Sequence, residues 1–255
     1  MKMFSTCMEC LKELGHPSFE PMYVDYYDDR VGSVMCARGH KSLLMLQSQK
    51  FEVLMESGAN ALLEGFTLEA CSSFASALER AIEFALRVLC TARGMSSEAW
   101  TATYSEIARQ SERQLGAFIV EHTLAFGSPY KPLKKLVEIR NRVIHKGEIL
   151  NLKEASGFCA LAYEEIVKIM SSLKHKFESA VQECVRHDVA ERSKSLEPGP
   201  RAHASGCSFY SLTCEIDPRP FSDALTQHRK ALELVRGAEE PMRALFAALG
   251  GTPAA

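Results

Sequence analysis

Between residues 51 and 184 the apolar side chains recur with the spacing of α-helices, and this pattern limits the possible fold more than any other feature of the chain. The pattern is interrupted where glycine or proline ends a helix, at Gly94, at Gly127-Ser128-Pro129 and at Gly147. Short interruptions favour antiparallel neighbours. The sequence therefore predicts a mainly α fold built around an antiparallel bundle of four or five helices.

The interruptions divide this region into four helical segments. The first, 61–89, is expected to be two helices or one helix bent near Gly65. The others are expected at 104–126, 132–145 and 152–183. The sequence thus assigns the bundle to residues 51–185.

The regions on either side of the bundle have a different character. Residues 1–46 form a turn-rich, β-prone module with a short strand expected at 31–35. Residues 186–206 are polar and contain Pro198, Gly199 and Pro200, which predicts a linker or exposed loop. Residues 207–255 are expected to be a C-terminal extension, with a strand at 209–216 and one or two helices at 221–249 because of Pro241.

Composition excludes some classes of protein. The net charge is −2, so no overall positive field attracts nucleic acid, and any such contact must come from a local patch. No stretch approaches the roughly 18 consecutive apolar residues of a membrane span, and the N-terminus lacks the pattern of a signal peptide. These patterns predict a soluble cytoplasmic protein that does not bind membranes.

Two short-spaced pairs of metal-binding residue types lie in the N-terminal module, Cys7-x2-Cys10 and Cys36-x3-His40. Together they supply the four ligands of a tetrahedral zinc site, with His16 as the alternative to His40. A module of about 40 residues has little core of its own, so a metal would replace one. Four protein ligands leave no open position, which predicts a structural zinc.

Other interpretations of the cysteines stay open. The four residues above could be incidental side chains in a β-hairpin. There are nine cysteines, an odd number, and Cys207 and Cys214 lack a partner pair, so we interpret them as structural. Those in the helical pattern are expected to pack in the core as small apolar residues: Cys71, Cys90, Cys159 and Cys184.

Residues 132–145 combine an apolar stripe with an arginine. Five apolar residues fall within about 160° of the helix circumference: Leu136, Val137, Ile139, Val143 and Ile144. Arg140 lies inside that stripe. A guanidinium keeps its proton, so burying it requires an anion, either a phosphate or a carboxylate such as that of Glu69 or Glu79. His145, five residues on, can transfer protons near neutral pH.

The motif Arg140-Asn141-x3-His145, followed by Lys146-Gly147 and one long helix, resembles the HEPN family (higher eukaryotes and prokaryotes nucleotide-binding). Residues 74–83 are similar to an early helix of that family, and the resemblance covers roughly residues 51–184. The second metal-binding pair is similar to the closing knuckle of a zinc ribbon. The resemblance implies a HEPN-type helical bundle preceded by a zinc-ribbon-like module.

The resemblance also implies an activity. Members of this family are metal-independent endoribonucleases with one Arg–His pair from each subunit of a homodimer. Here His145 would be the general acid or base and Arg140 would stabilise the transition state. Asn141 would orient His145 or bind the phosphate, and Arg142 and Lys146 would bind the RNA backbone. Similar proteins are toxins or antiviral defence effectors, which implies a possible antitoxin or regulatory partner.

A second hypothesis assigns no catalysis to the motif. Arg140 would then only pair with a carboxylate, and His145 would only cap its helix near Gly147. The bundle would be a non-catalytic module for dimerisation or nucleotide binding, and the zinc ribbon would dock nucleic acid or protein. Expressing His145→Ala and Arg140→Ala variants separates the two hypotheses.

Overall fold

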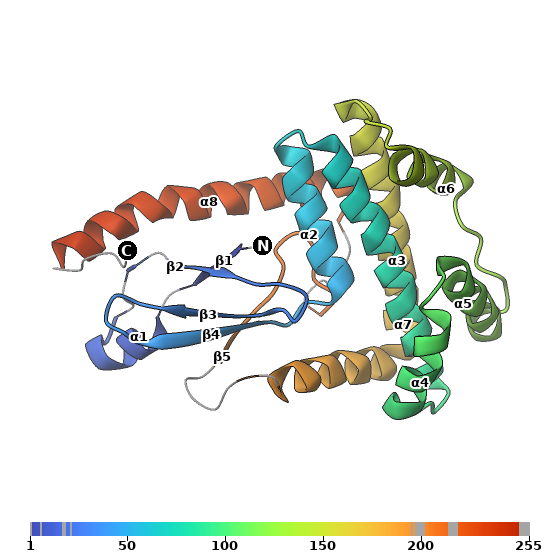
Figure 1. The fold of residues 1–255 in the computed structure, drawn as a ribbon, viewed down its shortest axis with the longest axis horizontal. Coiled ribbons are helices and arrows are strands. Elements are labelled where there is room, and N and C mark those ends of the chain that lie inside the picture. Colours follow the sequence, from blue (N-terminus) through green and yellow to red (C-terminus); the bar gives the residue numbers. More distant parts are fainter. Residues whose placement is uncertain are drawn as a thin grey trace. The chain divides into compact units, whose positions relative to one another are not determined.

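The computed structural model describes residues 2–5, 7–16, 19–20, 22–194, 196, 202–213 and 219–249 (Figure 1). The fold is mainly helical, as the sequence predicts. The chain forms two compact units, and each is built from separate stretches of sequence. Unit 1 contains Met1–Ser48, Asp188–Ser208 and Gln227–Ala255, and unit 2 contains Gln49–His187 and Phe209–Thr226.

Unit 2 is a bundle of helices. In chain order these are α2 (Lys50–Leu63), α3 (Thr67–Ala92), α4 (Ser97–Ile107), α5 (Ser111–Phe126), α6 (Lys134–Arg140), the π-helical turn η1 (Asn141–His145) and α7 (Leu152–Lys194), of which residues 188–194 belong to unit 1. The predicted break near Gly65 is confirmed, because Gly65 has a left-handed φ of 82° between α2 and α3. Gly94 and Gly127 likewise have positive φ values at the ends of α3 and α5.

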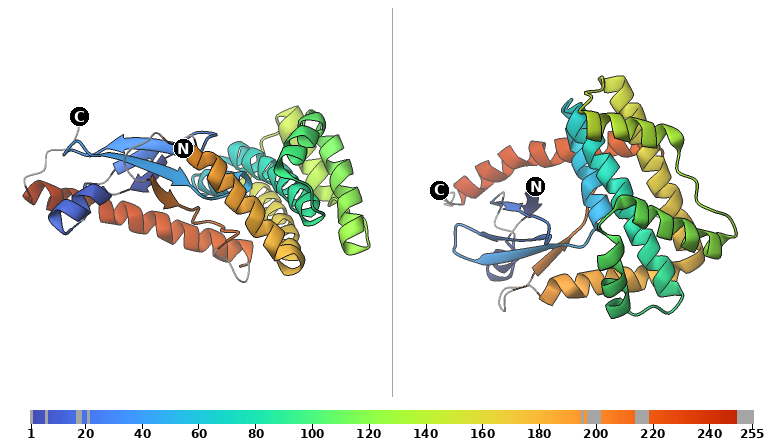
Figure 2. Two further views of the ribbon diagram at one scale, coloured as in Figure 1. Left: turned by 90° about the horizontal axis from the view of Figure 1, so that it is seen from below. Right: turned by 45° about the vertical axis from the view of Figure 1, so that its right-hand side comes forward.

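Helices α2 and α3 lie side by side (Figures 1 and 2). Gly58 makes this close packing possible. A Cβ atom at Gly58 would lie 2.6 Å from Cδ2 of Phe74 and 3.2 Å from the carbonyl oxygen of Ala70. The two helices therefore approach each other where one of them has no side chain.

Two predicted helices differ in the structure. The segment at 104–126 is not one helix, because Gln110 is extended (φ −144°, ψ 127°) and separates α4 from α5. The Ser96 hydroxyl accepts a hydrogen bond from the Ala99 amide and caps α4, so that helix begins before the predicted start. Helix α7 is longer than predicted and is kinked at Phe177, where φ is −134° and ψ is 37°.

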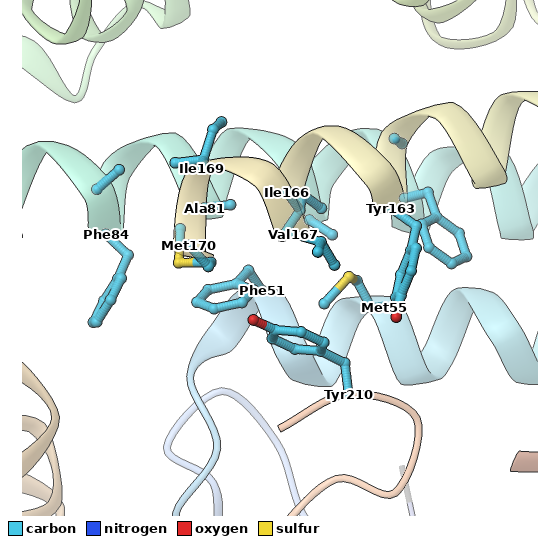
Figure 3. Close-up of a cluster of buried hydrophobic side chains, with 14 of the residues drawn as sticks. Phe51, Met55, Ala81, Phe84, Tyr163, Ile166, Val167, Ile169, Met170 and Tyr210 are labelled. Atoms are coloured by element: carbon cyan, nitrogen blue, oxygen red, sulfur yellow. The ribbon is translucent and has the colours of Figure 1, made fainter. Parts of the chain in front are cut away.

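The core of unit 2 lies among α2, α3, α7 and a returning segment of the chain (Figure 3). Phe51 and Met55 of α2 face Ile166, Val167 and Met170 of α7. The aromatic rings of Phe74, Tyr163, Phe209, Tyr210 and Phe221 pack edge-on or tilted, with centroids between 5.5 and 6.3 Å apart.

The returning segment at 209–213 forms no strand, although the sequence predicts one at 209–216. The amides of Phe209 and Leu212 donate hydrogen bonds to the carboxylates of Glu56 and Glu52, at 3.2 and 2.8 Å. The backbone is thus satisfied by side chains of α2 instead of by a neighbouring strand. Residues 214–216, including Cys214, lie outside the described residues.

Unit 1 contains two small sheets. β1 (Lys2–Ser5) pairs antiparallel with β2 (Met22–Asp25), and the second sheet has the order β3 (Val31–Met35), β4 (Lys41–Leu46), β5 (Ala202–Ser205). The strand predicted at 31–35 is confirmed. β5 is parallel to β4, so a segment far along the chain completes this sheet.

The region predicted as a linker or loop, 186–206, is partly regular. α7 continues to Lys194, and residues 202–205 form β5. Arg192 on this end of α7 is buried and donates hydrogen bonds to the carbonyl oxygens of Leu46 and Ser48, at 2.6 and 3.2 Å. Backbone carbonyls at the end of β4 thus hold a guanidinium that the polar composition alone would place in solvent.

The remaining helices of unit 1 are α1 (Met8–Leu14) and the greater part of α8 (Phe221–Ala248). α8 is one helix that includes Pro241. Among the described residues, no helix combines the length and the apolar character needed to cross a bilayer.

Candidate metal centre and candidate active site

Cys7, Cys10, Cys36 and His40 come together in unit 1, and their ligand atoms all lie within 4.8 Å of one another. The three cysteines are buried, and Met22 and Val34 pack around them. The group could hold a metal ion. His16, the alternative to His40, instead stacks on Phe19, with ring centroids 5.4 Å apart.

Three of the six distances between these atoms fit tetrahedral coordination, and all six are at most 4.8 Å. Ligands about 2.3 Å (sulfur) and about 2.0–2.1 Å (nitrogen) from a zinc ion lie about 3.8 Å apart for two sulfurs and about 3.5 Å apart for sulfur and nitrogen. The Sγ atoms of Cys10 and Cys36 are 3.9 Å apart. His40 Nδ1 lies 3.4 Å from Cys10 Sγ and 3.7 Å from Cys7 Sγ. These edges match the expected tetrahedron to within about 0.2 Å.

Local backbone structure sets each pair. Cys7 is the N-cap of α1, and its Sγ accepts a hydrogen bond from the Cys10 amide at 3.5 Å. In the second pair the Gly39 amide donates to the Cys36 carbonyl at 2.8 Å, and Gly39 adopts a left-handed φ of 81°. The sequence predicts the ligand spacing but not α1, which begins directly at the first cysteine.

A carboxylate supports the histidine from outside the cluster. Glu13 Oε1 lies 3.2 Å from His40 Nε2, while Nδ1 faces the cysteines. A hydrogen bond from Nε2 to a carboxylate leaves Nδ1 free to bind a metal and fixes the ring orientation. Glu13 is three residues after Cys10 on α1, a position that the spacing of the ligands does not indicate.

The thiols of the cluster differ in acidity. Burial acts to raise the pKa of Cys7, but hydrogen bonds from the Cys10 amide and from His40, Cys10 and Cys36 lower it to about 7. Burial and the neighbouring Cys7 and Cys36 raise the pKa of Cys10 to about 12. A metal that binds the cluster must therefore displace a proton from Cys10.

The second candidate site is the arginine–histidine motif of unit 2. Arg140 Nη2 forms an ion pair with Glu79 Oε1 of α3, one of the two carboxylates that the sequence suggested. The side chains are 28% and 34% exposed, so the pair lies at the edge of the core. Of the apolar stripe around Arg140, Leu136 and Val143 are buried, whereas Val137 and Ile144 are exposed.

The π-helical turn brings the motif residues together. In a regular α-helix the fifth residue lies far round the circumference, and the sequence therefore places His145 on the flank of the helix. Residues 141–145 instead form a π-helical turn, whose i→i+5 hydrogen bonding brings residues five apart nearly into line. Arg140 Nη1 lies 3.4 Å from His145 Nε2 and 3.5 Å from Asn141 Oδ1.

The other predicted RNA-binding residues lie nearby in sequence but differ in their contacts. Arg142 Nη1 forms an ion pair with Glu148 Oε1 at 3.0 Å. Lys146 is exposed and forms no ion pair in the part of the chain that the structure describes. A cavity of about 260 Å³ adjoins the motif and is lined by Glu79, Arg140 and Asn141 together with apolar side chains of α3, α5 and α6.

A comparison of the chain with models of protein families, with curated protein sequences and with solved structures finds no match.

Proposed function

We propose that unit 2 is a metal-independent endoribonuclease of the HEPN type that acts as a homodimer. The proposal depends on one observation, the 3.4 Å approach of Arg140 Nη1 to His145 Nε2 across the π-helical turn. π-helical turns are rare in proteins, and those that are found frequently lie at functional sites. Here the turn joins a phosphate-binding group and a proton-transferring group on one accessible edge of the bundle.

The contact suggests the roles of the two side chains. A guanidinium only donates hydrogen bonds, so His145 Nε2 carries the lone pair in this arrangement. That nitrogen can accept a proton from the 2′-hydroxyl of RNA, which then attacks the adjacent phosphorus. Arg140 stabilises the negative charge that develops on the phosphate oxygens. The products are a 2′,3′-cyclic phosphate and a 5′-hydroxyl, and neither step uses a metal.

The ion pair with Glu79 is compatible with phosphate binding. The guanidinium has five N–H groups, and Glu79 occupies Nη2. Nη1 remains directed towards His145 and Asn141. Glu79 thus acts as a positioning residue that fixes the guanidinium plane. Asn141 and Lys146, both exposed, supply further polar contacts to the RNA backbone.

Exposed apolar side chains near the motif support dimerisation. Val137 and Ile144 are 45% and 40% exposed, on the same helical segment as Arg140 and His145. A two-fold axis beside this segment would cover them and bring two Arg–His pairs into one cleft. Neighbouring exposed apolar residues could extend the contact: Leu133, Ile149 and Leu152.

The test is RNA cleavage by purified protein in the presence and absence of a chelator. We expect wild-type protein to produce fragments with 2′,3′-cyclic phosphate ends, and His145→Ala and Arg140→Ala to lose this activity. His175→Ala removes an exposed histidine of α7 and serves as the matched control. Intact RNA with wild-type protein, or equal cleavage by the variants, would refute the proposal.

The Glu79 ion pair also supports a second candidate function. If this ion pair serves only to neutralise the charge of Arg140, the bundle is a non-catalytic module for dimerisation or nucleotide binding. Wild-type protein would then dimerise or bind nucleotide without cleaving RNA. The resemblance to HEPN proteins further suggests a defence or toxin role with a regulatory partner, which co-expression toxicity assays would test.

For unit 1 we propose that the bound metal is zinc. Three thiolates and one imidazole suit zinc, and four protein ligands leave no position for a substrate. Zinc would link the start of α1 to the β3–β4 turn. The zinc module would dock nucleic acid or protein for the bundle, and metal analysis of the purified protein tests the identity of the ion.

A further inference from the structure

Unit 2 contains a second cavity, away from Arg140 and His145, between α5, the loop that follows it and α7. Its volume is about 410 Å³, within the range of about 300–1,000 Å³ that is typical of small-molecule sites. Neither Arg140 nor any residue of η1 lines it. The cavity is therefore a separate candidate for a ligand.

Aromatic rings form one wall of the cavity. The His122 ring lies 4.7 Å from that of Phe126 and 5.8 Å from that of Tyr130, and Tyr130 packs edge-on against Phe118 at 5.0 Å. His122 Nδ1 donates a hydrogen bond to the Ser128 carbonyl at 2.8 Å, which holds the loop against α5. The faces of such rings attract organic cations. Lys176 Nζ already lies over the Phe126 ring, 5.3 Å from its centroid, so the wall open to a ligand is the part formed by His122 and Tyr130.

A buried carboxylate lies among these rings. Glu165 of α7 lines the cavity and is only 5% exposed. Tyr130 donates a hydrogen bond to it, and burial together with the charge of Glu165 raises the pKa of the Tyr130 hydroxyl. One hydroxyl cannot use the whole acceptor capacity of a carboxylate. A buried carboxylate is stabilised by a further donor, and a cation is the most favourable one.

Two lysines place positive charge at the exposed part of the cavity, opposite in sign to the Glu165 carboxylate. Lys131 follows Tyr130 directly, and Lys168 is one helical turn after Glu165. Both are exposed, and neither forms an ion pair with any residue that the structure describes. Two unpaired ammonium groups at one cavity favour an anion.

We infer that this cavity binds a small zwitterion, with a primary ammonium group on Glu165 against the aromatic wall and a phosphate or carboxylate on Lys131 and Lys168. A simple cation would leave the lysines uncompensated, and a simple anion would meet the charge of Glu165. A wholly apolar ligand would bury Glu165 without a partner. Opposite charges at the two ends of one molecule satisfy both groups.

Isothermal titration calorimetry of the full-length protein tests the inference. The probes are O-phosphoethanolamine and 4-aminobutyrate, which carry an ammonium with a phosphate or a carboxylate. Ethanolamine and inorganic phosphate each lack one of the two charges. We expect at least one zwitterion to bind at least about tenfold more tightly than either truncated probe, and the better one identifies the anionic group.

Matched variants assign the binding to this cavity. Glu165→Gln should weaken binding by about tenfold or more, because a charge-assisted hydrogen bond to a buried group is lost. Glu164→Gln, at the exposed neighbouring position, should leave binding unchanged. Lys168→Ala should weaken binding a few-fold, and Lys153→Ala, an exposed lysine of the same helix outside the cavity, should have no effect.

Three results would overturn the inference: no binding of either zwitterion at millimolar concentrations, equal binding of ethanolamine or phosphate, or equal effects of the variants and their controls. If Glu165→Gln fails to fold, the double variant Lys131→Ala/Lys168→Ala decides. Its exposed lysines are not needed for folding, and it must lose the preference for O-phosphoethanolamine over ethanolamine.

Discussion

The two proposed functions differ in how strongly Arg140 is coupled to Glu79. A double-mutant cycle measures this coupling. The cycle uses Arg140→Ala, Glu79→Ala and the double variant. At about 4 Å and an effective dielectric constant of about 20 the two charges attract by about 4 kcal/mol. Both side chains are about a third exposed, so desolvation, side-chain entropy and salt screening reduce the net value. We expect a coupling free energy of about 1 kcal/mol.

The chain offers a specific signal for this measurement. Trp100 is its single tryptophan, lies in α4 of unit 2, is 8% exposed and stacks on Tyr104 with centroids 5.0 Å apart. Urea titrations monitored by tryptophan fluorescence therefore report the unfolding of unit 2. Each of the four proteins gives a free energy of unfolding, and the cycle gives the coupling.

RNA cleavage by the same variants completes the experiment. We expect Arg140→Ala to lower cleavage by about 10²- to 10³-fold, as for the loss of a group that stabilises transition-state charge. Glu79→Ala should stay within about tenfold of wild type, because the positioning residue does not touch the phosphate. A coupling of about 3 kcal/mol or more, the value for a broken buried pair, would refute this reasoning. Arg140 would then be a structural residue.

Four further predictions concern the metal centre and the bundle. Cys10→Ser should abolish stoichiometric zinc binding by atomic absorption, with Cys90→Ser as the control. Chelation should increase hydrogen exchange of residues 7–40, and unchanged exchange would show that the metal is dispensable. Zinc affinity, measured by competition with a chromophoric chelator, should rise with pH because Cys10 must lose a proton. The dependence should steepen below about pH 7, where Cys7 is also protonated, and a flat profile would contradict the thiol assignment. Gly58→Ala should destabilise unit 2 by about 1–3 kcal/mol in urea titrations, because the new methyl group meets the Phe74 ring. An unchanged midpoint would mean that α2 and α3 separate without cost.

Much of the bundle could be predicted from the sequence because glycines mark its breaks. Gly65, Gly94 and Gly127 each have a left-handed φ that ends or separates helices. The break before α5 has no such marker, since Gln110 is an ordinary residue in an extended conformation. Strand β5 cannot be predicted from the sequence for a different reason. Its pairing with β4 is determined by residues more than 150 positions apart, which local pattern does not reveal.

The candidate sites, too, could be predicted where neighbouring residues determine them and not where distant residues or an irregular helix do. The spacing Cys7-x2-Cys10 and Cys36-x3-His40 predicts the metal cluster because short loops constrain where the side chains can lie. The approach of His145 to Arg140 was not predictable, because the periodicity argument assumes α-helical geometry and residues 141–145 are π-helical. Contacts between distant elements, such as that of Glu79 with Arg140, could only be offered as alternatives.

Because both compact units are assembled from separate stretches of sequence, the order of synthesis on the ribosome matters. Strand β5, one of the two partners of β4, emerges more than 150 residues after β4 itself. The aromatic side chains of Phe209, Tyr210 and Phe221 complete the hydrophobic core only after the whole of α7 has been made. A nascent chain that carries the complete Arg140–His145 motif therefore still has an unfinished core. If unit 2 has the proposed activity, it can become competent only after Phe221 has been made.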